Sequence, residues 1–409
     1  MSVTLFENKQ DCCGCGACKN VCPRDAISMV ADEDGFAYPQ IDAQRCVKCG
    51  ACKKACGYQN PSSRSRPIVC YAAAAKDTAL LKKSASGGVF AVMAKEVLGN
   101  GGVVYGVAMS MENGGLTARH IRIDSIEGLN ALQGSKYVQS DTGKTYSDAK
   151  KDIFAGRQVL YSGTPCQIAG LLSYLGKEYE NLLTMEVICH GVPNGRMFRD
   201  FLKTLEEQKC KSVTGFSFRT KNRGQGKNVC VEYCGTDGVT SKRTCDGNQY
   251  SYVYFFQKAL VFRSSCYSCK FAAAERTADI TVGDYWGFHE EYPIVRSDSG
   301  LSNATGVSCV LLNSEKGVRY FEKCSSVLSI LETEFEKVAK HNMQLRVPCR
   351  KQPEREVILR LYREQGYRAV EQHFHKTCWK NRVVSMAMEM VPMGLKRAVK
   401  RAKGLLRKN

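Results

Sequence analysis

The chain has 409 residues, a formal net charge of +19 and 22 cysteines. That length predicts a small module beside a larger body of one or two lobes. No segment approaches the ~18 apolar residues that a membrane-spanning helix needs, and no apolar run at the N-terminus suggests secretion. The cysteines are therefore interpreted as reduced metal ligands of a cytoplasmic protein and not as a disulfide scaffold.

Much of the positive charge is local, because residues 376–409 carry ten Lys or Arg and a single acid, Glu389. None of the sequence signatures of nucleic-acid-binding domains occurs, so we expect no nucleic-acid partner. Iron–sulfur clusters with four thiolate ligands are net anionic, and part of the positive charge can offset them.

The first sixty residues contain one four-cysteine pattern twice, which indicates an internal duplication. The positions are Cys12, Cys15, Cys18 and Cys22, and then Cys46, Cys49, Cys52 and Cys56. In two-cluster ferredoxins, three closely spaced cysteines hold one 4Fe-4S cube and the fourth serves the other cube. We therefore predict one cluster on Cys12, Cys15, Cys18 and Cys56, and a second on Cys46, Cys49, Cys52 and Cys22. Zinc, which takes two close cysteine pairs, is the weaker alternative, and Cys13 is interpreted as a bystander.

The chain divides into four segments along its length. We predict a two-cluster ferredoxin-like domain at 1–60, a polar linker at 61–67, an oxidoreductase body at 68–345, and a helical appendage with a basic tail at 346–409. Within the body, short apolar runs predict strands over 68–75, 103–108, 159–161, 182–189, 213–218 and 280–282. Amphipathic stretches predict helices over 89–98, 146–154, 167–175, 197–207 and, in the appendage, 354–375. The expected class is α+β, with a mixed α/β body and a small N-terminal module of the bacterial ferredoxin type.

Four cysteines of the body stand at positions that suggest a third metal site. Cys166 lies between a predicted strand and a helix, and Cys189 ends the next predicted strand. Both would emerge at the carboxyl edge of a parallel sheet, where ligands collect. Cys266 and Cys269 form a Cys-x-x-Cys loop. A third 4Fe-4S cluster is the favoured interpretation; zinc, a redox disulfide and unconnected buried cysteines remain alternatives. His190 is interpreted either as a proton donor in a cofactor pocket or as a hydrogen-bonded structural histidine.

Clusters carry one electron at a time, so two-electron chemistry would require an organic cofactor. The sequence has no Gly-x-Gly-x-x-Gly fingerprint for a dinucleotide fold. Two segments are better candidates for a flavin site: Ser86, Gly87 and Gly88 before a predicted helix, and the run that contains Gly134, Ser135, Lys136 and Gln139. Backbone N–H groups at a helix start favour a pyrophosphate, although such a turn is more often an ordinary helix cap.

The order of several motifs resembles the beta-subunit family of coenzyme F420 hydrogenases and dehydrogenases over roughly residues 1–345. The motifs are Ser86-Gly-Gly-Val-Phe90, Gly134-Ser-Lys-Tyr-Val-Gln-Ser140, Ser162-Gly-Thr-Pro-Cys-Gln167, Ile188-Cys-His-Gly191, Cys266-Tyr-Ser-Cys-Lys-Phe271 and Asp279-Ile-Thr-Val-Gly-Asp-Tyr-Trp-Gly287. The resemblance implies that Cys166, Cys189, Cys266 and Cys269 hold a core cluster and that FAD binds near Ser86, Gly87, Gly88 and Lys136. It identifies no catalytic residue and no substrate.

The expected function is that of an oxidoreductase with three 4Fe-4S clusters and FAD. It would pass electrons between a ferredoxin or another redox protein and F420 or another small organic substrate. A non-enzymatic electron-transfer subunit of a larger redox complex is the main alternative. A cluster-bearing regulatory protein is a weaker one. The sequence leaves the oligomeric state open, a homo-oligomer included.

The basic tail has two interpretations. Leu395, Val399, Ala402 and Leu406 share one helical face, surrounded by Lys and Arg. Such a helix can lie on an anionic membrane surface, which would place the protein at the inner face of the membrane. The same composition also suits a solvated tail.

Overall fold

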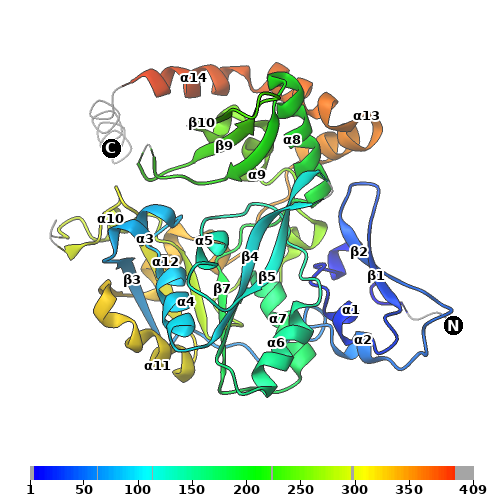
Figure 1. Cartoon of the computed structure of the whole chain (residues 1–409), viewed down its shortest axis with the longest axis vertical. Helices are drawn as coiled ribbons and strands as arrows, with labels where there is room; N and C mark the ends of the chain where they lie inside the picture. Colours follow the sequence, from blue (N-terminus) through cyan, green and yellow to red (C-terminus); the bar gives the residue numbers. More distant parts are fainter. Residues whose placement is uncertain (1–3, 62, 113, 223, 296–298, 392–409) are drawn as a thin grey trace.

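The computed structural model describes residues 4–61, 63–112, 114–222, 224–295 and 299–391. A main sheet with its helices lies at the centre, the N-terminal module lies against one side of it, and a smaller sheet with the C-terminal helices lies at one end (Figure 1). The residues of the basic tail named above lie outside the described part of the chain.

The main sheet has eight strands in the order β13-β3-β12-β11-β7-β6-β4-β5. The strands are β3 (Val69–Ala75), β4 (Val103–Glu112), β5 (Gly115–Ile123), β6 (Val159–Gly163), β7 (Leu182–Val187), β11 (Ile280–Asp284), β12 (Ser308–Leu312) and β13 (Leu328–Thr333). The central strands β4, β6, β7 and β11 are parallel to one another, and the remaining pairs are antiparallel. The mixed α/β class predicted for the body is confirmed.

Helices cover both faces of this sheet because alternate strand residues point to opposite sides. Leu160 of β6 packs with helix α4 on one face, whereas Tyr161 packs with α6 and α7 on the other. The helices are α3 (Thr78–Lys83), α4 (Val89–Gly99), α5 (Leu129–Leu132), α6 (Thr145–Phe154), α7 (Pro165–Leu175), α10 (Phe288–Glu291), α11 (Glu315–Lys323) and α12 (Phe335–His341).

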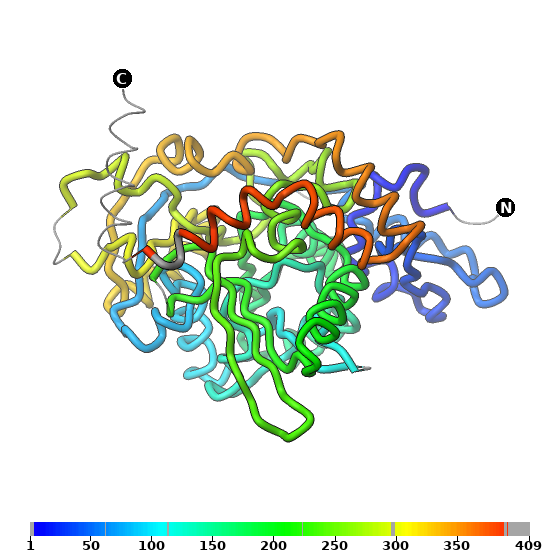
Figure 2. Tube along the Cα trace, turned by 90° about the horizontal axis from the view of Figure 1, so that it is seen from above, coloured from blue at the N-terminus to red at the C-terminus, as the bar shows by residue number. Residues whose placement is uncertain are grey.

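A second lobe is built around a three-stranded antiparallel sheet of order β10-β9-β8. Its elements are α8 (Gly195–Lys209), β8 (Ser212–Ser217), β9 (Asn228–Cys234), β10 (Thr240–Asp246), α9 (Ser251–Gln257), α13 (Glu354–Thr377) and α14 (Trp379–Met390). Seen from above, α13 and α14 run across this lobe (Figure 2). Tyr367 and Phe374 of α13 are buried in one aromatic core with Phe201 and Tyr252. The predicted helix over 354–375 is therefore present and packs into the lobe.

The N-terminal module keeps its duplication in three dimensions. Each half has a short helix, α1 (Ala17–Val21) or α2 (Ala51–Lys54), and a hairpin of β1 (Ile27–Ala31) and β2 (Ala37–Ile41) lies between them. Gly16 and Gly50 precede the two helices with φ of 78° and 76°, a conformation that suits glycine. None of the helices within the described ranges is long and apolar enough to cross a membrane.

Candidate functional site

The first set of module thiols is Cys12, Cys15, Cys18 and Cys56. Burial raises the pKa of Cys12, Cys18 and Cys56, and neighbouring thiols of the same set raise it further. The structure thus places Cys56 of the second repeat near cysteines of the first repeat. This is the exchange of the fourth cysteine that the sequence predicts. Buried thiols that hinder one another's ionisation suit a site in which iron compensates the thiolate charge.

The second set is Cys22, Cys46, Cys49 and Cys52, which line one small cavity with Pro23. The backbone N–H of Ala26 donates to the sulfur of Cys22 at 3.3 Å. Cys49 is exposed, whereas Cys52 is buried. Of the two module sets, this one therefore has an edge open to solvent.

The body thiols meet at the carboxyl edge of the main sheet. Strands β6 and β7 are parallel, so Cys166 in the first turn of α7 and Cys189 just after β7 emerge on the same side. Cys266 and Cys269 complete the lining of one small cavity, and Cys266 lies in a short 3-10 turn, Ser264–Ser268. Burial raises the pKa of Cys266 to about 12 and that of Cys269 to about 11. Four thiols from three separate segments converge here.

A buried ion pair holds the Cys266–Cys269 loop in place. Glu186 of β7 is fully buried and accepts a hydrogen bond from Nε of Arg276 at 2.7 Å. Nη1 of Arg276 also donates to the carbonyls of Phe271 and Ala273, both at 3.0 Å. The pair therefore joins β7, which precedes Cys189, to the segment that follows Cys269.

The sulfur spacing of these three sets is wider than a single zinc ion requires. Zinc–sulfur bonds of about 2.3 Å in a tetrahedron hold sulfurs about 3.8 Å apart. Within the described ranges, no three cysteine sulfurs lie within 4.8 Å of one another. None of the 22 cysteines, all of which lie in the described ranges, forms a disulfide. The donor sets fit a larger thiolate-ligated group such as a 4Fe-4S cluster.

Cys13 lies between the first module set and the body set. Its thiol is 5% exposed and hydrogen-bonds with the thiols of Cys15 and Cys166. The hydrogen bond from Cys13 lowers the pKa of Cys166 to about 7. Cys13 lines the small body cavity together with Tyr58 of the module. The sequence analysis interprets Cys13 as a bystander. The spacing of Cys13 from the other cysteines gives no sign that it lies between the two sets.

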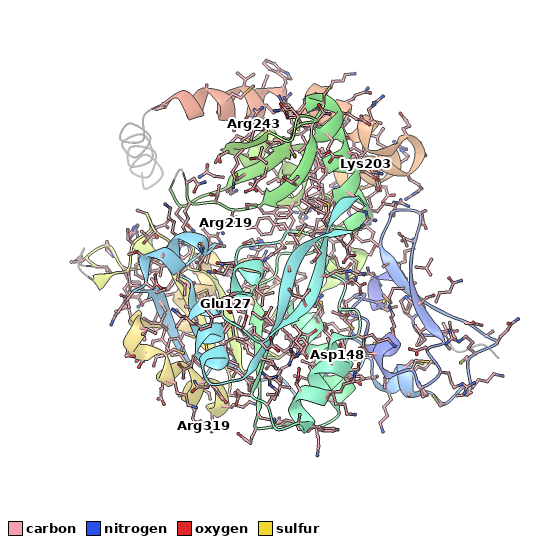
Figure 3. All side chains as sticks on the ribbon, in the orientation of Figure 1. Glu127, Asp148, Lys203, Arg219, Arg243 and Arg319 are labelled. Carbon is pink, nitrogen blue, oxygen red and sulfur yellow. The ribbon has the colours of Figure 1, made fainter. Side chains whose placement is uncertain are left out.

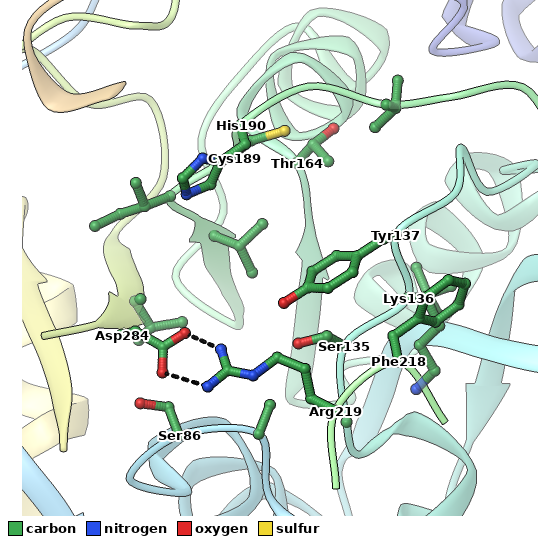
Figure 4. Close-up of a pocket in the computed structure, with 18 of the residues that line it drawn as sticks. Ser86, Ser135, Lys136, Tyr137, Thr164, Cys189, His190, Phe218, Arg219 and Asp284 are labelled. Carbon is green, nitrogen blue, oxygen red and sulfur yellow. Dashed lines mark hydrogen bonds and ion pairs between the residues drawn. The ribbon is translucent and has the colours of Figure 1, made fainter. Parts of the chain in front are cut away.

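A large pocket of about 640 Å³ adjoins the body thiols. Cys166, Cys189 and His190 line both this pocket and the small thiol cavity. Figure 4 shows Cys189 and His190 on one side of the pocket and the pair formed by Arg219 and Asp284 on another. Burial lowers the pKa of His190. A pocket of this size is typical for a small organic ligand or cofactor.

The predicted flavin residues lie mostly around this pocket, with one exception. Ser86, Gly88, Gly134, Ser135, Lys136 and Gln139 line it. Gly87 does not, because its N–H donates to the hydroxyl of Ser308 at 2.9 Å and its backbone packs against β3. Ser86 likewise donates its hydroxyl to the carbonyl of Val307 at 2.9 Å. Gly88 precedes α4 with φ of 82°.

Lys136 already has hydrogen-bond partners within the protein. Its amine donates to the carbonyls of Ala131, Leu132 and Gln133 at 3.1, 2.9 and 2.8 Å. These carbonyls belong to the end of the short helix α5, which a cation stabilises. Burial lowers the pKa of Lys136 to about 7. Through these three hydrogen bonds the Lys136 amine holds the end of α5 in the pocket wall.

Besides Tyr137, which lies in the predicted Gly134–Ser140 run, the structure places in the pocket several groups that the sequence interpretation missed. Arg219 pairs with Asp284 at the end of β11, and its guanidinium lies 5.5 Å from the Trp286 ring. In Figure 3, Arg219 lies between the second lobe and the main sheet. The Tyr137 ring stacks on Phe256 at 4.3 Å between centroids. Asp284 falls within a motif quoted above, but no local pattern marks Arg219.

Two families match the chain. Residues 11–60 match the family described as a 4Fe-4S dicluster domain. Residues 156–338 match the family described as the C terminus of the beta subunit of coenzyme F420 hydrogenase/dehydrogenase. These ranges contain the two module thiol sets and the four body thiols, respectively.

Comparisons with whole proteins are less informative. No curated protein matches the chain. Among solved structures, a chain of the F420-reducing NiFe hydrogenase complex from Methanosarcina barkeri is 14% identical, with a TM-score of 0.41 over 76% of this chain and 93% of that chain. A likeness at this level carries no argument about function.

Proposed function

We propose that this chain, whose residues 156–338 belong to the coenzyme F420 hydrogenase/dehydrogenase beta-subunit family, is an iron–sulfur flavoprotein oxidoreductase. The family matches make it an iron–sulfur electron-transfer protein with 4Fe-4S clusters. To this we add three inferences: a third cluster on the body thiols, FAD in the large pocket, and F420 or another organic molecule as the substrate.

One observation carries the proposal: the body thiols and the large pocket share a wall. Cys166 and Cys189 line both cavities, so a group held by these thiols would lie beside a molecule in the pocket. Clusters supply one-electron transfer, and a flavin converts single electrons to the pairs that organic substrates need. Transfer of electrons between the cluster and the flavin requires the two groups to lie this close together.

The pocket residues suit a flavin by their chemistry. Tyr137, Phe218 and Trp286 offer aromatic surface to a planar ring, and Arg219 and Lys227 offer positive charge to phosphates. Burial lowers the pKa of Lys227, as expected for an amine withdrawn from water. We expect Arg219 to keep its orientation through Asp284, because the pair is largely buried.

The second module set marks the docking surface for the redox partner. Cys49 is exposed, and five exposed cations surround this set, which we call the basic rim: Arg24, Arg45, Lys48, Lys53 and Lys54. Arg24 and Lys48 line the same cavity as the thiols. Complementary charge steers partners together, so we propose an electron-carrier protein with an acidic surface, such as a ferredoxin.

The alternative is an electron-transfer subunit that serves a catalytic partner and turns over no substrate itself. The pocket argues against it, because a protein that only relays electrons needs no cavity of about 640 Å³ beside its thiols.

Anaerobic reconstitution of the full chain with iron, sulfide and FAD tests the proposal. We expect about twelve irons and one FAD per chain, at four irons per cluster. A screen of F420, NADH, NADPH and reduced ferredoxin should then give flavin reduction or oxidation. About eight irons without flavin would contradict the proposal. Full iron without flavin or substrate turnover would favour the relay subunit.

A further inference from the structure

Arg263 is a buried cation at the junction between the module and the body. Its side chain is 0% exposed. It reaches the module through Nε, which donates to the carbonyl of Cys12 at 2.9 Å, and through Nη2, which donates to the carbonyl of Ala37 at 2.8 Å. Nη1 donates to Oε1 of Gln139 in the body at 3.1 Å. One side chain thus joins both parts of the molecule.

The guanidinium also faces a sulfur of the first module set. Nη2 lies 3.9 Å from Sγ of Cys12. Gly14 makes this approach feasible, because a Cβ there would lie 2.9 Å from Cζ of Arg263. On the other side, the Tyr38 ring lies 4.1 Å from Cζ and shields the cation from water.

Arg263 has no carboxylate to balance its charge within the part of the chain that the structure describes: none lies within 4.0 Å of its guanidinium nitrogens. Arg219 and Arg276, by contrast, pair with Asp284 and Glu186. A buried charge without a counter-ion is costly, so a site of this kind is expected to face an anion. The neighbouring thiol set would hold one, because a 4Fe-4S cluster with four thiolates is net anionic.

We infer that Arg263 is the internal counter-ion of the group held by Cys12, Cys15, Cys18 and Cys56. This rests on the proposed function, which assigns a cluster to those thiols. A fixed cation favours the reduced state, since reduction adds negative charge, and therefore raises the midpoint potential of that cluster. The same contacts fix the module against the body, so Arg263 is a positioning residue for the junction.

Redox potentiometry monitored by EPR on the anaerobically purified full chain tests this inference. Arg263→Gln removes the charge. We expect the midpoint of the second module cluster to stay unchanged, that of the body cluster to fall slightly because Arg263 also acts on Cys166 and Cys266, and that of the first module cluster to fall most. Arg263→Lys keeps the charge and should stay closer to the wild type. Gln139→Glu keeps the arginine but places a carboxylate on it, and should lower the same midpoint.

Lys9→Gln is the matched control. Lys9 also lies near the Tyr38 ring, at 6.0 Å, but it is half exposed and already paired with Asp32 and Glu33. We expect no shift in any midpoint, because water screens an exposed pair.

Unchanged midpoints in an iron-replete Arg263→Gln protein would overturn the inference. If that variant does not fold, Gln139→Glu decides, and unchanged midpoints there would equally overturn it. A different result would show that the proposed function itself is wrong. If these thiols hold no cluster, the Cys12→Ser variant would contain as much iron as the wild type.

Discussion

Single glycines determine how closely the module approaches the body. A Cβ on Gly57 would lie 2.2 Å from the carbonyl oxygen of Ala169 in α7, and one on Gly170 would lie 2.8 Å from Sγ of Cys15. Neither position has room for a side chain. Together with Cys13, these glycines bring the first module set against the body set. Close approach of this kind is what electron transfer between two buried groups requires.

Cys189→Ser should remove the core cluster and leave the module clusters in place. We expect the iron content of the purified chain to fall by about four atoms, measured by a colorimetric iron assay. Cys324→Ala is the control, because Cys324 is a buried thiol in the core under α11 and away from the three sets. Equal iron in Cys189→Ser and in the wild type would contradict the assignment of the body thiols.

The parallel strands β6 and β7 create the site by ending at one edge of the sheet. The pocket segment before α6 is fixed to these strands by His120 of β5. One ring nitrogen of His120 lies 3.1 Å from the carbonyl of Ser162, and the other lies 3.0 Å from the hydroxyl of Ser140. Burial lowers the pKa of His120 to about 4, so the ring is neutral in the folded protein at neutral pH.

This depressed pKa predicts a loss of stability in mild acid. Between pH 6.5 and 4 the unfolded chain binds a proton on His120 that the folded chain does not, so the free energy of unfolding falls as the pH falls. From pH 7.5 to 5.5 we expect a loss of about 1 kcal/mol that is absent in His120→Gln, measured by denaturant unfolding at both pH values. His373→Gln, a change at a half-buried histidine of α13, should retain the loss. An identical pH dependence in wild type and His120→Gln would contradict the prediction.

Across the whole molecule, the three thiol sets and the pocket follow one another in space. The set with an exposed cysteine lies farthest out and carries the basic rim. The first module set comes next, followed by the body set and the pocket. Under the proposed function, this order would place the redox partner protein at one end of the molecule and the small molecule at the other.

Charge reversal in the basic rim should slow electron exchange with an acidic carrier. For the double variant Lys48→Glu and Lys53→Glu, we expect the second-order rate with reduced ferredoxin to fall about tenfold at low ionic strength and to depend less on salt. Stopped-flow absorbance measures this rate. The double variant Lys203→Glu and Lys209→Glu, at exposed positions of α8 in the second lobe, is the control with the same change of charge. Equal slowing by the control would argue against a specific docking surface.

Local patterns in the sequence predicted the repeated or strongly apolar parts of the fold. The strands predicted over 159–161 and 182–189 and the helix over 89–98 occur as β6, β7 and α4. Strand β10 was missed because its first four residues are all exposed and show no alternation of apolar and polar side chains. Strands β5, β9 and β13 were also missed, since pairing with neighbours, more than composition, stabilises them. Strand β12 was missed although all five of its residues are buried.

The sequence by itself predicted the ligand types and their grouping in the module, because a 4Fe-4S site built on a tight turn is encoded in the spacing of a few residues. It also indicated that Cys166 and Cys189 would share an edge of the sheet. Only the tertiary structure decided that Cys13 and Arg263 lie between module and body, that Lys136 secures a helix end, and that Arg219 enters the pocket. These roles depend on contacts between residues more than sixty positions apart or on a chain reversal, and neither leaves a periodic signal in the sequence.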